Sequence, residues 1–334
     1  MRYLDALAAN PILLAPMAGV ADAPFRAINK RFGAGLTCSE MISAKGLHYD
    51  QGRNRSHRLL RLAPEEIPAV VQLFGSDPQL MADQAAAVAE LMGDTILAID
   101  INMGCPVPKV VNKGDGSALM KTPDLAAEIV AAMRTTLDVC GRSDLVVTAK
   151  IRKGWSPQSL NAVQFAQNLQ AAGAAAITVH GRTADQFYRG SSDRDSIAAV
   201  KAALTIPVIA SGDAFSAEDC FSIMQQTGAD AVMVARGAYG NPWIFQRAAA
   251  ILAGESGPSL PPEPSLQQRL AMLREHAQMV VDWYDDPHLA RMRKHAAWYV
   301  ARRPAAAIFR QRLHSISTLE QLDQLIEDYL EQQG

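Results

Sequence analysis

The chain has 334 residues, of which 49% are hydrophobic and 20% charged, and its formal net charge is −2. This is the composition of a globular protein, and the length suits one large domain with a small second one. The near-neutral charge favours no class of partner by itself, although it can conceal local patches.

The four cysteines, Cys38, Cys105, Cys140 and Cys220, lie far apart in the sequence. They form no C-x-x-C pair, zinc spacing or iron–sulfur run, so we expect no metal site. A disulfide framework does not suit a chain of this size, so we expect reduced thiols and a cytoplasmic protein. The first residues do not resemble a signal peptide, and no apolar run is long enough to span a membrane. We therefore expect no membrane contact, and nothing in the sequence indicates a stable protein partner.

Eight short apolar runs recur along the chain, and each is followed by a segment with helical periodicity. They cover residues 11–17, 36–42, 69–75, 96–103, 145–152, 176–182, 207–213 and 231–237. Continuous apolar character is typical of parallel strands that are covered on both faces. Strand–helix alternation over roughly 250 residues predicts a (β/α)8 TIM barrel. A doubly wound open sheet is the alternative, but the first turn lacks its G-x-G-x-x-G motif.

Helix starts are marked between these runs. Asp77-Pro78, Thr122-Pro123 and Asn241-Pro242 each predict an N-cap followed by proline at the first helical position, and Ser216 with Asp219 resembles a capping box. The stretch "GESGPSLPPEPS" at 254–265 is typical of a linker, and the pattern after it is purely helical. We therefore predict a barrel over residues 1–257 and a small helical domain over 258–334.

Polar residues stand where the predicted strands end, and barrels of this kind carry their chemistry at that edge. They are Gln72, Asn102, Cys105, Lys150, Arg152, His180, Arg182, Gly212, Asp213, Arg236 and Gly237. Each has an ordinary explanation when taken singly: a solvated lysine, a structural glutamine or histidine, or a cysteine that fills space. Their shared position on one rim favours a functional site instead.

The loops after the last two predicted strands, "ASGDAF" and "ARGAYGNP", contain glycines. They are either two simple tight turns or a phosphate site, because glycine lets backbone N–H groups approach an anion closely. Barrels commonly hold phosphate at this place, so we favour the second interpretation. Lys150 then lies across the barrel mouth, where a cation can stabilise an anionic ring such as a reduced flavin. A Schiff-base lysine of an aldolase is the rival role.

Nine stretches of the sequence together resemble the tRNA-dihydrouridine synthase family, most closely its bacterial B-type branch. They are "LAPMAGVADAPFR" (14–26), "SEMI" (39–42), "VQLFGSDP" (71–78), "DINMGCPVPKV" (100–110), "GSALM" (116–120), "KIRKGW" (150–155), "VHGRT" (179–183), "SGD" (211–213) and "ARGAYGNPW" (235–243). The resemblance covers nearly the whole chain. Ser211 departs from it, because the family often has asparagine there.

The resemblance implies a barrel that binds FMN, a C-terminal helical domain that binds tRNA, and NADPH or NADH as a transient reductant. The implied FMN contacts are Pro16, Met17, Ala18, Gln72, Lys150, Gly212, Asp213, Arg236 and Gly237, with His180 near the cofactor. Asn102, Arg152 and Arg182 would face the substrate nucleotide. The product would be 5,6-dihydrouridine.

Cys105 would be the proton donor in this reaction. Hydride from the flavin would reach C6 of uracil, and C5 would then need a proton. A thiol with a pKa near roughly 8.5 is protonated at neutral pH yet acidic enough to give its proton to a carbanion. Gly104 would permit a sharp turn and Pro106 would fix the next backbone angle, so that the thiol stands on a short, stiff arm.

A basic segment follows the predicted linker. No Asp or Glu occurs from Pro287 to Leu319, whereas Arg291, Arg293, Lys294, Arg302, Arg303, Arg310 and Arg312 all do. Trp298, Tyr299 and Phe309 are interleaved with them. Such a run is usually a solvated face with core aromatics, but one-sided positive charge on a near-neutral chain favours nucleic acid. We therefore predict that Arg291, Arg293 and Lys294 bind the tRNA backbone, and that Arg302 and Arg303 stand at a helix end before Pro304.

Two rival functions stay open. One is a flavoenzyme that acts on a free pyrimidine base, which would not need a basic helical domain. The other is a non-catalytic RNA-binding protein on an enzyme scaffold, against which the presence of Gln72, Cys105 and Lys150 argues.

Overall fold

The computed structural model describes residues 2–49 and 55–332. Eight parallel strands form its sheet: β1 (Ile12–Leu14), β2 (Ile42–Ser43), β3 (Ala69–Phe74), β4 (Ile96–Met103), β5 (Val146–Arg152), β6 (Ile177–His180), β7 (Val208–Ser211) and β8 (Ala231–Val234). Each strand from β2 to β7 pairs with the next in the chain, and β1 pairs with β8. This order confirms the barrel and excludes a doubly wound sheet, whose strand order reverses at a switch point.

The second predicted strand, over residues 36–42, was wrong in its extent. Only Ile42–Ser43 is regular strand, while Thr37 and Cys38 form single parallel bridges with Leu14 and Val70. The backbone N–H of Gln72 bonds to the Ser39 hydroxyl at 3.0 Å instead of to a strand carbonyl. The side chain of Ser39 thus interrupts the regular ladder. The two bridges still close the ring between β1 and β3.

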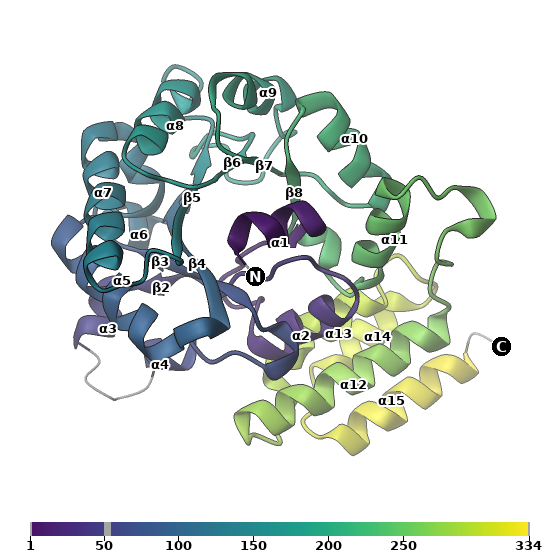
Figure 1. The fold of residues 1–334 in the computed structure, drawn as a ribbon. Helices are drawn as coiled ribbons and strands as arrows, with labels where there is room; N and C mark the ends of the chain where they lie inside the picture. The colour runs from purple at the N-terminus through teal and green to yellow at the C-terminus, as the bar shows by residue number, and fades with distance from the viewer. Residues whose placement is uncertain (1, 50–54, 333–334) are drawn as a thin grey trace.

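Helices surround the ring, as Figure 1 shows. The main ones are α2 (Ala23–Arg31), α5 (Pro78–Met92), α7 (Pro123–Val139), α8 (Ala162–Ala171), α9 (Arg194–Ala203), α10 (Ala217–Thr227) and α11 (Trp243–Leu252). Shorter helical pieces are α3 (Ala44–Tyr49), α4 (Arg55–Arg58) and α6 (Pro108–Val111).

The predicted helix caps are confirmed in part. The Asp77 side chain accepts a hydrogen bond from Leu80 N at 3.0 Å, and Ser216 forms its capping box with Asp219. Thr122 precedes α7 but makes no side-chain cap. The prediction for Asn241 was wrong, because its amide donates to Gly237 O at 3.2 Å and α11 begins only at Trp243.

The helix α1 (Tyr3–Ala9) fills the middle of the ring in Figure 1. Its Tyr3 and Leu7 belong to the apolar cluster inside the barrel, together with small strand residues such as Ala98 and Ala231. The helix thus contributes side chains to the packing that a barrel interior needs.

Four helices form a bundle beside the barrel: α12 (Leu266–Tyr284), α13 (Met292–Tyr299), α14 (Ala306–Leu313) and α15 (Leu319–Glu331). Their apolar core also takes in Ile28 and Trp243 from α2 and α11, so the bundle packs directly on the barrel. The expected linker at 254–265 joins α11 to α12, and the expected boundary after residue 257 falls within it.

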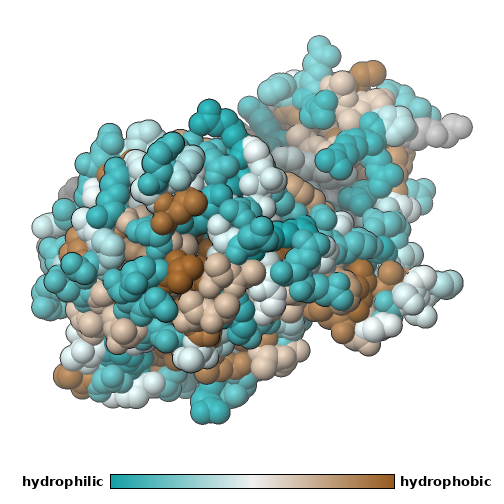
Figure 2. Space-filling view, turned by 90° about the horizontal axis from the view of Figure 1, so that it is seen from above, coloured by the Kyte–Doolittle hydropathy of each residue, from teal (hydrophilic) through white to brown (hydrophobic). Residues whose placement is uncertain are grey.

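The surface of the molecule is mainly hydrophilic on one face. In Figure 2, hydrophilic residues cover most of the visible face, and hydrophobic ones form small separate patches. Among the described residues, we find no helix with the length and apolar character to span a bilayer. Arg302 and Arg303 follow the end of α13, as expected from the proline after them.

Gly240 lies where the barrel and the bundle are in close contact. A Cβ there would lie 2.5 Å from backbone atoms of Trp298 and Tyr299, and its φ is +60°. Gly228 has a similar φ of +65°, but the nearest atom to its Cβ would be a flexible Lys201 carbon at 3.9 Å.

We therefore predict that Gly240→Ala destabilises the fold by about 1–3 kcal/mol more than Gly228→Ala, because both lose the left-handed glycine but only one clashes. Urea unfolding of the two variants measures the difference. Equal losses of unfolding free energy would mean that the bundle moves freely away from this contact.

Candidate active site

A cavity of about 460 Å³ opens at the carboxyl ends of the strands. It is lined by most of the residues expected at this rim: Pro16, Met17, Ala18, Gln72, Asn102, Cys105, Lys150, Arg152, His180, Gly212, Asp213 and Arg236. The structure thus brings together side chains from seven of the strand ends. Arg182, Gly237, Arg291, Arg293 and Lys294 do not line it.

The Cys105 turn is held by the side chain of Asn102. Asn102 Oδ1 accepts hydrogen bonds from the backbone N–H of Cys105 at 2.9 Å and of Gly104 at 3.2 Å. Gly104 does not have a positive φ, and a Cβ there would lie no closer than 3.4 Å to Lys150 O, so the turn does not require glycine at this position. The glycine that the turn does require is Gly116, with φ +62°, because a Cβ there would lie 2.7 Å from Cys105 O.

A chain of hydrogen bonds fixes the direction of this asparagine. The carboxylate of Asp100 accepts from Thr148 Oγ1 at 2.6 Å and from Gln72 Nε2 at 2.7 Å. Gln72 must therefore turn its Oε1 away from Asp100, and that oxygen accepts from Asn102 Nδ2 at 2.9 Å. Asn102 in turn can present only its oxygen to Cys105. A buried acceptor on β4 thus sets the orientation of two amides and of the cysteine turn.

The thiol of Cys105 is half-buried, and burial raises its pKa above the ordinary value. A backbone N–H and the charges of Arg152, Lys109 and Lys150 act in the opposite direction but do not cancel the effect. At neutral pH the thiol is therefore protonated, which is the state that a proton donor needs.

Lys150 supplies positive charge to the cavity. Burial, followed by the charge of Arg152, lowers its pKa to about 8, while Asp100 acts to raise it. The ammonium group is therefore mostly charged at pH 7 and loses its proton in mildly alkaline solution.

Two buried arginines hold the loop between β6 and α9. Arg152 donates from Nε to Gly104 O at 2.7 Å and from Nη1 to Thr183 O at 2.7 Å and Phe187 O at 3.0 Å. Its guanidinium thus ties the Cys105 turn to that loop. Arg182 lies behind the cavity wall and donates to Arg189 O at 3.2 Å and to Gly190 O at 2.5 Å.

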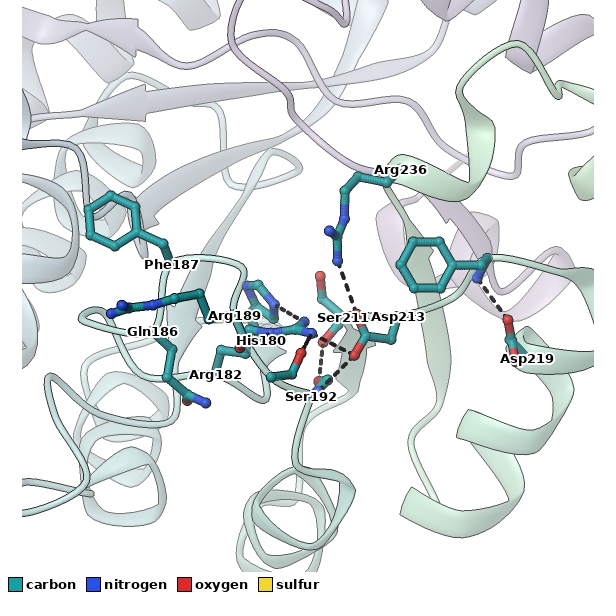
Figure 3. Close-up of polar contacts among 12 residues, drawn as sticks. His180, Arg182, Gln186, Phe187, Arg189, Ser192, Ser211, Asp213, Asp219 and Arg236 are labelled. Carbon is teal, nitrogen blue, oxygen red and sulfur yellow. Dashed lines mark hydrogen bonds and ion pairs between the residues drawn. The ribbon is translucent and has the colours of Figure 1, made fainter. Parts of the chain in front are cut away.

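The loop after β7 is built around Asp213, as Figure 3 shows. Its carboxylate bonds to Arg182 at 2.7 Å, Arg236 at 3.1 Å and the backbone N–H of Ser192 at 2.7 Å. Burial acts to raise the pKa of Asp213, but the hydrogen bond from Arg182 and the two cations lower it overall. A Cβ on the preceding Gly212 would lie 2.5 Å from Ser192 Oγ, so this position has no room for a side chain.

His180 is neutral in this setting. Burial and four neighbouring cations, with Lys150 the largest of these, hold its pKa well below the usual range. Arg182 Nη1 lies 3.3 Å from His180 Nε2, and a guanidinium can only donate, so Nε2 accepts. The ring proton is therefore on Nδ1.

The basic segment is mainly exposed, but it is not uniform. Arg291, Arg293 and Lys294 are exposed, whereas Arg312 pairs with Asp328 on α15. Lys294 Nζ would lie 3.8 Å from a Cβ on Gly19, so it stands beside the loop that carries the cavity residues Met17 and Ala18.

The interleaved aromatics have different surroundings. Tyr299 and Phe309 are buried in the bundle core, which confirms that interpretation for them. Trp298 instead stacks on Tyr239 of the cavity wall, with ring centroids 3.8 Å apart and an interplanar angle of 11°.

Sequence reasoning missed several residues at this site. Asp100 was visible only as a charge inside an apolar strand, and its partners Gln72 and Thr148 come from other strands. Phe187, Tyr188 and Phe215 line the mouth from loops, where no periodicity marks them.

A thiol, a lysine and a glycine-containing loop thus line one cavity at the carboxyl ends of the strands, which is the arrangement of a barrel enzyme. The family described as dihydrouridine synthase (Dus) matches residues 13–333. The tRNA-dihydrouridine synthase B of Xanthomonas campestris pv. campestris is 41% identical over 97% of this chain and 93% of its own. A probable tRNA-dihydrouridine synthase of Rhodobacter capsulatus is 42% identical over 89% of this chain and 88% of its own.

The chain therefore belongs to the dihydrouridine synthase family, whose members are flavin-dependent oxidoreductases. Among solved structures, histamine dehydrogenase from Rhizobium sp. 4-9 aligns with a TM-score of 0.55 at 14% identity. That alignment covers 73% of this chain and 46% of the other, and it shows the fold alone.

We predict that Asp100→Leu raises the rate of Cys105 alkylation by iodoacetamide about tenfold, since removing a buried hydrogen bond costs about 1–3 kcal/mol. Without the carboxylate, the side-chain amides of Gln72 and Asn102 can flip, and the Cys105 turn then loses its hydrogen bonds to Asn102. Thr148→Val is the matched control, because it removes one bond to Asp100 but leaves Gln72 fixed.

Peptide mass spectrometry measures this rate, with the exposed Cys140 as the internal reference. The same Cys105 rate in both variants and the wild type would show that the turn holds without Asp100.

Proposed function

We propose that this protein is a tRNA-dihydrouridine synthase, which reduces the C5–C6 double bond of a uridine in tRNA with FMN and NADPH or NADH. The observation that supports this most is Cys105, a thiol held on a fixed turn in the lining of a cavity that the glycine-containing loop after β7 also lines. The relatives named above carry the same activity in their names.

The cavity residues fit FMN. Gly212 lines the cavity and packs without a Cβ against Ser192, and a glycine backbone in the cavity wall can come close to a phosphate. Arg236 lines the same wall of the cavity. Because Asp213 is also paired with Arg182, Arg236 can use its other N–H groups to bind an anion in the cavity. Gly237 packs against Ala214 O and shapes this loop rather than the cavity. Lys150, with Gln72 and the Pro16–Ala18 segment, would face the flavin ring.

The chain's own residues account for the proton. When bound, FMN supplies a hydride to C6 of uracil after reduction by the nicotinamide cofactor. The Cys105 thiol gives its proton to C5, and the S–H bond breaks as the C–H bond forms. Arg152, Lys109 and Lys150 stabilise the resulting thiolate until it takes up a proton from water. Arg152 also keeps the turn in place while this happens.

The surface that binds the RNA backbone would lie on the helical bundle, beside the opening of the cavity. Arg291, Arg293 and Lys294 are exposed there, and no acidic residue interrupts their segment. A uridine in folded RNA must be unstacked before it reaches the cavity, and backbone contacts help to hold it in that state. Arg182 has a different role from the expected one, because its donors are used to hold Asp213 and the β6–α9 loop.

We predict that Cys105→Ala lowers dihydrouridine formation by roughly 10²–10⁴-fold, which is the usual contribution of a general acid. Binding of FMN and oxidation of NADPH should persist, because neither step uses the thiol. Mass spectrometry of digested tRNA measures the product. Cys140→Ala, on an exposed thiol, is the control, and a full product yield from Cys105→Ala would refute the proton-donor role.

We predict that replacing Arg291, Arg293 and Lys294 by Glu weakens tRNA binding and flattens its salt slope by about one unit for each phosphate that the variant no longer binds. The single change Lys294→Glu should weaken tRNA binding and flatten the salt dependence by a smaller amount. Arg2→Glu is its matched control, since Arg2 is exposed at the start of α1.

A salt titration of tRNA affinity measures both effects, and FMN content shows that the barrel is intact. If tRNA affinity depends on salt in the variant as it does in the wild type, the tRNA-binding surface lies elsewhere, and a free pyrimidine becomes the favoured substrate.

A further inference from the structure

Three aromatic side chains stand in solvent at the mouth of the cavity. Phe187 is 40% exposed, Tyr188 61% and Phe215 49%, and all three line the opening. Phe187 and Tyr188 belong to the loop between β6 and α9, and Phe215 to the loop after β7. We call these three residues the aromatic rim. Exposed aromatic rings gathered at one opening are typical of a binding surface.

The loop that carries the rim is held in a strained form. Phe187 has a φ of +51°, which is costly for a bulky residue. Its carbonyl accepts from Arg152, and its N–H donates to Ala184 O at 3.2 Å. Arg182 fixes the far end of the loop through Arg189 O and Gly190 O. Two buried cations thus hold the backbone on both sides of Tyr188 in place.

The rim also carries positive charge. The guanidinium of Arg236 lies 5.2 Å from the ring centre of Tyr188 and 4.9 Å from that of Phe215. Arg189 is exposed in the same loop. Exposed rings beside cations are the arrangement that binds single-stranded nucleic acid, because bases stack on the rings and phosphates meet the charges.

We propose that the aromatic rim stacks on a nucleobase of the RNA next to the uridine that enters the cavity. This inference rests on the proposed function. A uridine that leaves the RNA stack deprives its neighbour of a stacking partner, and the rim would replace it. The rim would thereby favour the unstacked form of the substrate.

The alternative occupant is the nicotinamide dinucleotide, whose rings can stack as well. The structure favours RNA because one guanidinium, that of Arg152, holds both the Phe187 carbonyl and the Gly104 carbonyl of the Cys105 turn. Cys105 acts on the uridine and has no part in oxidising the reductant. The rim is thus tied to the group that serves the RNA step.

The two steps of the reaction can be tested apart on the FMN-loaded protein by flavin absorbance. NADPH reduces the flavin without RNA, and unmodified tRNA then oxidises it under anaerobic conditions. We expect Tyr188→Ala to slow the tRNA step about tenfold at subsaturating tRNA, the usual effect of removing one stacked ring. The NADPH step should stay as in the wild type. Tyr188→Phe keeps the ring and should restore the rate.

Phe215→Ala is the second variant, and its tRNA step should slow in the same way. Tyr49→Ala is the control, because Tyr49 is 73% exposed and does not line the cavity. An unchanged tRNA step in Tyr188→Ala and Phe215→Ala would overturn the proposal. So would a slowed NADPH step with a normal tRNA step, which would assign the rim to the reductant. A wild-type flavin that tRNA does not oxidise would refute the proposed function itself.

Discussion

A carboxylate can only accept hydrogen bonds, and at Asp100 this property sets the direction of the polar groups beneath the cavity. Gln72 must give its NH2 group to Asp100, so its oxygen faces Asn102, and the oxygen of Asn102 faces the Cys105 turn. Burial raises the pKa of Asp100, while the bonds from Gln72 and Thr148 and the charge of Lys150 oppose that shift. A neutral amide in place of Asp100 could present either its oxygen or its NH2 group to Gln72, and would leave two directions open.

Arginine has the complementary property, because it can only donate. Arg152 and Arg182 are both nearly inaccessible, yet each uses several N–H groups on backbone carbonyls of loops. Burying a guanidinium is costly unless its donors are satisfied, so each loop is held where its carbonyls meet those donors. The Cys105 turn, the β6–α9 loop and the Asp213 loop are thereby fixed relative to one another.

A row of aromatic rings joins the bundle to the cavity wall. Phe25 of α2 lies 5.5 Å from His295, His295 lies 5.1 Å from Trp298, and Trp298 stacks on Tyr239. Burial holds the pKa of His295 well below the usual range, and that of His276 beside it at about 3. Both rings are neutral at pH 7, and His276 Nδ1 also shares a hydrogen bond with the Tyr299 hydroxyl at 3.2 Å. The proposed tRNA-binding face and the cavity are thus parts of one packed body.

The barrel could be predicted from the sequence, because eight apolar runs separated by helical periods admit few other topologies, and parallel strands place their carboxyl ends on one rim. It also located most of the cavity residues, including Cys105 and Lys150, since strand ends are visible as breaks from apolar to polar.

The sequence did not determine which of those residues face the cavity and which support it. Arg182 and Gly237 stand at strand ends like the others, yet they hold loops, and Asp100 was hidden within a strand. These roles could be assigned from the folded structure alone, because a side chain's role depends on which donors and acceptors other strands bring within about 3 Å of it. Residues 72, 100, 102 and 148 meet only when β3, β4 and β5 pair in this register, and hydrogen-bond direction then leaves each amide one orientation.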